Sequence, residues 1–105
     1  MSQDIDMEKV RRENIRWHAM VALNAGSPDP VAATLILSAL QSVPGLAPTQ
    51  HDLKRALDYL EERGLVRLDK PEGAPWIAHL TRHGVDVVEY TVECDAGIAR
   101  PKKYW

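Results

Sequence analysis

The sequence predicts an α+β domain in which three helices precede a β-hairpin and a further helix follows it. Two observations lead to this prediction. The stretch from Thr49 to Leu68 contains a helix start, an apolar stripe, a glycine stop and a short β-branched strand. Turn-forming residues then separate this strand from a second one at 76–80. This order is typical of a winged helix-turn-helix, with a three-helix core, a two-stranded β-wing and a C-terminal helix.

The composition indicates a single globular domain. A chain of 105 residues can build one core, and its 27% of charged residues is ordinary for a soluble protein. The formal net charge of -2 gives no overall attraction to phosphate. Cys94 is the only cysteine, which excludes an intrachain disulfide and is typical of a reducing compartment. The sequence shows no membrane span and no signal peptide, so we expect a cytoplasmic protein that does not enter a membrane.

The first helix is predicted over residues 4–25. Acidic side chains, beginning with Asp4, lie near its start, where the helix dipole favours them. Gly26 is expected to end the helix. Its apolar surface is predicted to include Val10, Ile15, Trp17, Met20, Val21, Ala22 and Leu23, with Arg11, Arg12 and Arg16 outside it.

The second helix is predicted over about residues 30–42. Asp29 can serve as its N-cap and Pro30 as its first residue. Because the helix is more apolar than amphipathic, we expect it to be well buried. Residues 44–48 then form a turn, in which Leu46 is expected to enter the core.

The third helix begins at a capping-box-like pair, Thr49 and Asp52. A stripe of Leu53, Ala56, Leu57 and Leu60 gives it one apolar face, and Gly64 provides the stop. The predicted hairpin strands are residues 65–68 and 76–80. Lys70 is the only cation in the turn between them.

Residues 85–94 fit two structures. Apolar residues alternate with polar ones as in a half-buried strand, and the β-branched content favours that choice. The segment length and the possible N-cap Thr81 favour a helix. A helix would carry two apolar faces, one for the core and one for a second chain.

Several segments resemble the general winged-helix pattern. They are Leu53, Leu57, Tyr59-Leu60-Glu61, Gly64-Leu65-Val66 and His79-Leu80-Thr81 with Gly84. In that pattern a recognition helix ends before a "GLV" strand, and a wing strand ending in "LTxxG" opens the last helix. The resemblance covers about residues 10–94 and implies that residues 85–94 are helical. It specifies the fold better than the function.

Two further segments, Leu23-Asn24-Ala25-Gly26 and Leu80 to Pro101, resemble small winged-helix proteins of Mu-like transposable phages and prophages. Such proteins are often described as similar to ArsR-type regulators. The resemblance implies a phage protein in the cytoplasm of its host, but no settled activity. The chain departs from metal-sensing ArsR members, because it has one cysteine and no Cys-x-Cys cluster on the third helix.

The polar face of the third helix is the candidate surface for binding double-stranded DNA. Gln can pair with adenine, Lys or Arg with guanine, and Asp can accept from cytosine. The candidate residues are Gln50, His51, Lys54, Arg55 and Asp58. A solvated helix face is the alternative, since cations and anions are equal in number over residues 50–83.

Other cations are candidates for phosphate contacts on the wing, the first helix and the C-terminal tail. These are Lys70, Arg11, Arg12, Arg16, Arg100, Lys102 and Lys103. The domain is predicted over residues 4–96, followed by an extended basic-aromatic tail over 97–105. Tyr104 and Trp105 could stack on bases or dock on a neighbouring subunit, or the chain end could simply be disordered.

A homodimer is expected through the second apolar face of the last helix, with contacts from Val87, Tyr90, Thr91 and Cys94. No metal site is expected, because the spacing of His79, His83 and Cys94 matches no standard zinc motif. No phosphate loop or nucleophile elbow is present, so we expect neither an enzyme nor a cofactor. The expected function is transcriptional regulation by a phage DNA-binding protein. The alternative is a protein-interaction or phage-assembly module that does not bind DNA.

Overall fold

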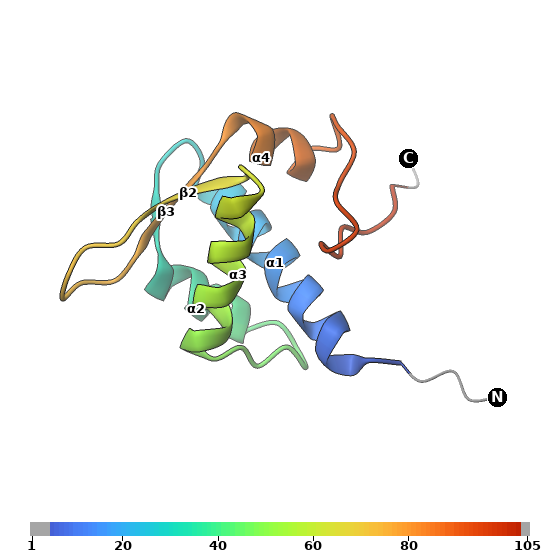
Figure 1. Ribbon diagram of the computed structural model, residues 1–105, viewed down its shortest axis with the longest axis horizontal. Helices are drawn as coiled ribbons and strands as arrows, with labels where there is room; N and C mark the ends of the chain where they lie inside the picture. Colours follow the sequence, from blue (N-terminus) through green and yellow to red (C-terminus); the bar gives the residue numbers. More distant parts are fainter. Residues whose placement is uncertain (1–4, 104–105) are drawn as a thin grey trace.

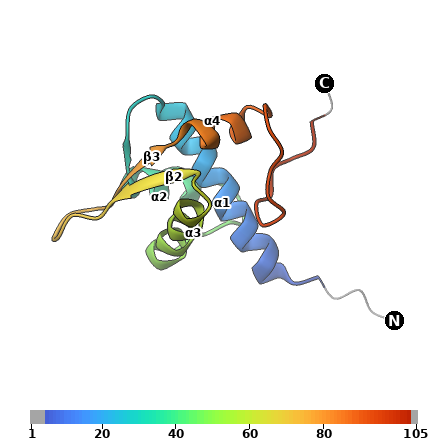
Figure 2. The same cartoon turned by 45° about the horizontal axis from the view of Figure 1, so that its top comes forward.

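A computed structural model describes residues 5–103 of the chain. Over these residues four helices and three strands follow in the order α1 (Met7–Gly26), β1 (Val31–Ala32), α2 (Ala33–Gln41), α3 (Gln50–Glu62), β2 (Val66–Asp69), β3 (Ile77–Leu80) and α4 (Arg82–Val88). The predicted α+β class is confirmed. Helix α1 crosses the molecule diagonally, with α2 and α3 on one side and the C-terminal segment on the other (Figures 1 and 2).

Helix α1 begins at Met7, because the Asp6 side chain accepts a hydrogen bond from the backbone N–H of Lys9 at 3.1 Å. Asp4, where the sequence predicted the start, lies outside the described residues. Gly26, which was expected to end the helix, is its last helical residue, and Ser27 is the C-cap. The helix buries Ile15, Trp17, Ala19, Met20 and Leu23, while Val10 and Val21 from the predicted apolar surface are exposed.

The prediction that Asp29 and Pro30 start the second helix was wrong. Residues Val31 and Ala32 instead form the short strand β1, which pairs antiparallel with β3. Helix α2 therefore begins at Ala33, with no side-chain hydrogen bond at its cap.

Helix α2 is also less buried than predicted. It buries Ala33, Ile36 and Leu40, whereas Leu35 is 65% exposed. The prediction that Leu46 of the following turn enters the core is confirmed, since this side chain is buried.

The three strands form one antiparallel sheet in the order β1-β3-β2. In the hairpin, Val66 pairs with Leu80 and Asp69 pairs with Ile77. The hairpin loop projects away from the helices (Figure 1). The central strand carries Ala78, which is fully buried. The two predicted hairpin strands are thus confirmed to within about one residue, and the third strand was missed.

A tight junction joins α3, β2 and α4. Gly64 has the positive φ of +74° that the predicted helix stop requires. The Thr81 hydroxyl donates to the carbonyl oxygen of Gly64 at 2.7 Å and accepts from the backbone N–H of Gly84 at 3.0 Å. A Cβ at Gly84 would collide with the carbonyl oxygen of Leu65. The glycine at this position therefore allows α4 to approach β2.

Helix α4 is shorter than predicted. It ends at Val88, and Tyr90 then adopts a positive φ of 63°. The helical interpretation of residues 85–94 is correct as far as Val88 and wrong beyond it. Helix α4 consequently has one buried face, on which Val87 is 2% exposed, and not two faces along its whole predicted length.

Residues 94–101, here called the C-terminal strap, pack along α1. Ile98 is buried in the core, and the backbone N–H of Ala99 donates to the carbonyl oxygen of Glu13 at 3.1 Å. The chain therefore stays part of the domain beyond the boundary predicted at residue 96. Tyr104 and Trp105, for which stacking was predicted, lie outside the described residues. Over residues 5–103, no helix is long and apolar enough to cross a bilayer.

Candidate nucleic-acid interface

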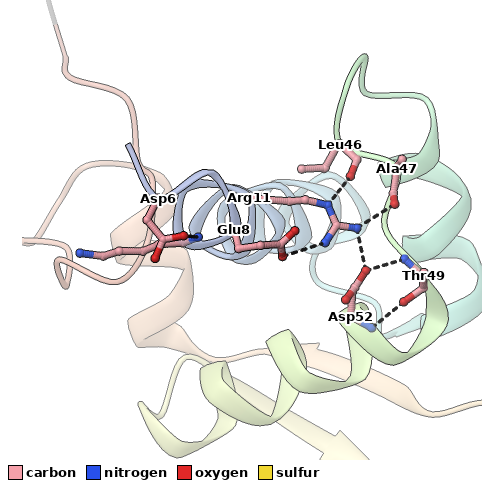
Figure 3. Close-up of polar contacts among 8 residues, drawn as sticks. Asp6, Glu8, Arg11, Leu46, Ala47, Thr49 and Asp52 are labelled. Atoms are coloured by element: carbon pink, nitrogen blue, oxygen red, sulfur yellow. Dashed lines mark hydrogen bonds and ion pairs between the residues drawn. The ribbon is translucent and has the colours of Figure 1, made fainter. Parts of the chain in front are cut away.

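Arg11 fixes the start of α3 relative to α1. Its guanidinium donates to the carbonyl oxygens of Leu46 at 2.9 Å and Ala47 at 2.8 Å, and to the carboxylate of Asp52 at 2.7 Å (Figure 3). We call Arg11 with these three acceptors the Arg11 clamp. Because Arg11 holds the turn and the first turn of α3 together, it is not free to contact a phosphate as the sequence suggested.

Asp52 also closes the predicted capping box, which is confirmed. Its carboxylate accepts from the backbone N–H of Thr49 at 2.9 Å, and the Thr49 hydroxyl accepts from the backbone N–H of Asp52 at 3.0 Å. The hydrogen bond from the Thr49 backbone is the main cause that lowers the pKa of Asp52 to about 2, and the Arg11 hydrogen bond adds to it. The carboxylate therefore stays ionised at neutral pH.

The N-terminal half of α3 presents an exposed polar face. The side chains of Gln50, His51 and Arg55 are exposed, and within residues 5–103 they make no hydrogen bond or ion pair. Lys54 is half-buried, with its Nζ 5.1 Å from the centroid of the Trp76 ring. These four predicted residues lie on adjacent turns, because they are spaced four apart in two pairs.

Asp58, the fifth predicted residue of this face, is not free. Its carboxylate accepts a hydrogen bond from Lys70 on the hairpin at 2.8 Å, which raises the pKa of Lys70. The Lys70 Nζ also lies 4.4 Å from the Trp76 ring centroid. The two side chains are 44% and 48% exposed, so the ion pair adds little stability. Asp58 and Lys70 nevertheless neutralise each other beside the α3 face.

A groove of about 440 Å³ separates the start of α3 from the hairpin loop. Its lining includes Thr34 of α2, Gln50 and Lys54 of α3, and Pro71, Pro75 and Trp76 of the hairpin. None of the described residues that line it is acidic. The groove therefore adjoins the exposed α3 face and offers one cation, Lys54, with no competing carboxylate.

Two other predicted phosphate contacts have structural roles. The Arg16 guanidinium lies 3.6 Å from the Tyr59 ring centroid and donates to the carbonyl oxygen of Gly97 at 2.8 Å. Arg100 donates to the carbonyl oxygens of Val87 and Val92, each at 2.9 Å. Both arginines thus fasten the C-terminal strap to the rest of the domain.

The remaining predicted cations differ in their surroundings. Arg12 is exposed and, like Arg55, has no hydrogen bond or ion pair in the described part of the chain. Lys102 is exposed. Lys103 is exposed too, with its Nζ 5.9 Å from the Tyr90 ring centroid. Arg12 and Lys102 therefore stay available for an external contact.

The predicted dimer residues do not form one exposed face. Val87 is in the core, and the Tyr90 ring packs edge-on against Trp17 with centroids 6.3 Å apart. The Tyr90 hydroxyl donates to the carbonyl oxygen of Pro101 at 2.6 Å. Thr91 is exposed, whereas Cys94 is half-buried and burial raises the pKa of its thiol. The C-terminal strap thus contacts two of the predicted dimer residues, Tyr90 through Pro101 and Val87 through Arg100.

The histidines considered as metal ligands lie on different elements, β3 and α4. His79 contacts Asp69 across the hairpin at 2.9 Å, and His83 is exposed on α4. In the described part of the chain, no cluster of three or more His, Cys, Asp or Glu side chains could hold a metal ion.

Sequence reasoning missed the Arg11 clamp and the contacts of both Lys54 and Lys70 with the Trp76 ring. The capping-box pattern predicted the role of Asp52 at the start of α3. No local pattern, however, pairs Arg11 with a turn 35 residues later. Comparison of the chain with protein-family models, with curated proteins and with solved structures found no match. The family assignment suggested by the sequence therefore stays a prediction.

Proposed function

We propose that this chain is a winged helix-turn-helix protein of phage or prophage origin, which binds double-stranded DNA and regulates transcription. The observation that supports this proposal best is the exposed N-terminal half of α3, where Gln50, His51 and Arg55 make no hydrogen bond or ion pair with any described residue. The order of helices and strands agrees with the proposal, because a hairpin follows α3 directly.

In this proposal α3 enters the major groove with its first two turns. Gln50 can recognise adenine through two hydrogen bonds, and His51 and Arg55 can donate to acceptors on base edges or phosphates. The hairpin loop lies beside the same face across the groove lined by Lys54 and Trp76. One DNA strand would pass close to this groove, with Lys54 as the phosphate contact.

The experiment is binding to fragmented phage and host DNA at two salt concentrations. We expect specific binding that weakens with salt and falls by about tenfold or more in Lys54→Ala/Arg55→Ala, since a lost base or phosphate contact costs about 1–3 kcal/mol. The matched control is Lys9→Ala/Arg82→Ala, which removes the same charge from exposed cations outside α3 that are not candidate DNA contacts. Failure of the wild type to bind any fragment at low salt would contradict the proposal.

A protein-interaction or phage-assembly module is the second candidate. The observation in its favour is that Arg11, Arg16, Lys70 and Arg100 bind groups of the chain itself. Few cations are then left for phosphates, which normally provide much of the affinity for DNA. A pull-down with the wild type and with Gln50→Ala/His51→Ala tests this candidate. Capture of the same partner by both proteins, without DNA binding, would place the partner outside the α3 face.

A further inference from the structure

A second groove, of about 320 Å³, runs between α1 and α3. Three arginines line it, namely Arg12 and Arg16 from α1 and Arg55 from α3. Tyr59 contributes its ring, and Ile15 is buried below. The groove thus places guanidinium groups from two helices around one hollow.

Three carboxylates also line this groove, but two of them are already neutralised. Asp52 is 2.7 Å from Arg11, and Asp58 is 2.8 Å from Lys70. Glu62 is the third and is exposed. Arg12 and Arg55 have no such partner in the described part of the chain. Two guanidiniums therefore face a single unpaired carboxylate, and the hollow has an excess of positive charge.

The arginines around Tyr59 also indicate an excess of positive charge at this groove. The guanidiniums of Arg16 and Arg63 lie 3.6 Å and 4.6 Å from the centroid of its ring. Burial is the main cause that lowers the pKa of Arg16, and repulsion from Arg12 and Arg63 lowers it further. An anion beside Arg12 would reduce the repulsion between Arg12 and Arg16.

We propose that the α1–α3 groove binds a phosphate group through Arg12 and Arg55. The planar guanidinium fork matches the geometry of phosphate oxygens and can bind them in a bidentate manner. Resting on the proposed function, we assign this phosphate to the DNA backbone beside α3. Arg55 is then a backbone contact, and sequence reading falls to Gln50 and His51.

Titration with inorganic phosphate tests the site without DNA. The side-chain Nε–H signals of Arg12 and Arg55 are followed by NMR at constant ionic strength, with chloride as the balancing anion. We expect both signals to shift saturably, while the signal of Arg82, 91% exposed on α4, stays in place. Equal shifts at all exposed arginines would overturn the phosphate site, and so would the absence of a shift at Arg12 and Arg55.

The salt dependence of DNA binding tests the source of the phosphate. In Arg12→Gln and in Arg55→Gln we expect the magnitude of the negative slope of log K against log salt concentration to fall by about 0.9 each. Arg82→Gln, with the same charge loss, should keep the wild-type slope. Thermal unfolding checks that the variants fold.

The possible failures are distinguishable. If the wild type binds DNA and both variants keep its slope, the backbone assignment is overturned and the proposed function stands. If phosphate shifts both arginine signals but no DNA binds at low salt, the proposed function fails and the site takes a free phosphate compound. If phosphate shifts neither arginine signal and no DNA binds at low salt, both proposals fail.

Discussion

The Arg11 clamp and the C-terminal strap each hold one segment against the rest of the domain, by different physical means. In each, one arginine donates to two backbone carbonyls: Arg11 to Leu46 and Ala47, and Arg100 to Val87 and Val92. Arg11 also binds a carboxylate, whereas Arg100 lies 4.4 Å from the centroid of the Tyr90 ring. The strap adds a buried aliphatic side chain, Ile98.

This difference separates cations that hold the fold from cations that remain available. The guanidiniums of Arg11, Arg16 and Arg100 are committed to carbonyls of the chain, although a sequence pattern cannot distinguish them from Arg12 or Arg55. Charge counting therefore overestimates the phosphate contacts that this chain can make. The following substitutions test the two attachments, from the largest expected effect to the smallest.

Ile98→Ala tests the apolar part of the C-terminal strap. We expect it to lower the free energy of unfolding by about 2–4 kcal/mol, because it removes buried methyl groups and leaves a cavity in the core. Urea denaturation measures the change. Val92→Ala, at a position that is 36% exposed, serves as the control. Equal stability of the two variants would show that the strap does not contribute to the core.

Arg11→Met tests the Arg11 clamp while keeping the aliphatic stem. We expect a loss of about 2–3 kcal/mol in the free energy of unfolding, since two carbonyls and a partly buried carboxylate lose their charged donor. Arg12→Met is the matched control on the next residue, and it should change stability by less than about 0.5 kcal/mol. A similar loss in both variants would argue against a specific clamp.

Arg100→Met tests the polar part of the strap. The expected loss is about 1–2 kcal/mol, smaller than for Arg11→Met, because no carboxylate is left without a partner. Thermal unfolding of Arg100→Met and Arg11→Met under the same conditions gives the comparison. A larger loss for Arg100→Met would reverse the order of the two attachments.

The dependence of stability on pH distinguishes the two attachments further. The pKa of Asp52 is about 2 in the folded protein, against an ordinary value of 3.8. A lowered folded pKa gives stability that is complete above the unfolded pKa and is lost as the pH falls through about 4 to 2. We expect Asp52→Asn to remove about 1 kcal/mol at neutral pH and to flatten the pH dependence in this window. An unchanged acid profile in Asp52→Asn would exclude Asp52 as its source.

The sequence predicted those elements whose signals are local. The Thr49–Asp52 capping box and the Gly64 stop are short-range features, and both were confirmed for α3. The hairpin strands followed from the turn-rich segment between them. Strand β1 was missed because Val31 and Ala32 become a strand only through pairing with β3, which lies far along the chain.

The candidate site divides in the same way. The exposed positions of Gln50, His51 and Arg55 follow from helical periodicity, so the sequence could place them on one face. Helical periodicity does not predict the hydrogen bonds that pair Asp58 with Lys70 and Arg16 with Gly97, because these are tertiary contacts. The dimer prediction failed at Val87 for a related reason, since packing of α4 buries this side chain in the core.

The Arg11 clamp also has a thermodynamic consequence for any partner of α3. The first turn of the helix is fixed through Thr49, Asp52 and Arg11 before a partner arrives (Figure 3). Association on this face should lose little backbone entropy and move the backbone little. The heat-capacity change should then reflect surface burial alone, without the larger change that accompanies coupled folding. The chain presents α3 as a rigid template, and a partner has to adapt to it.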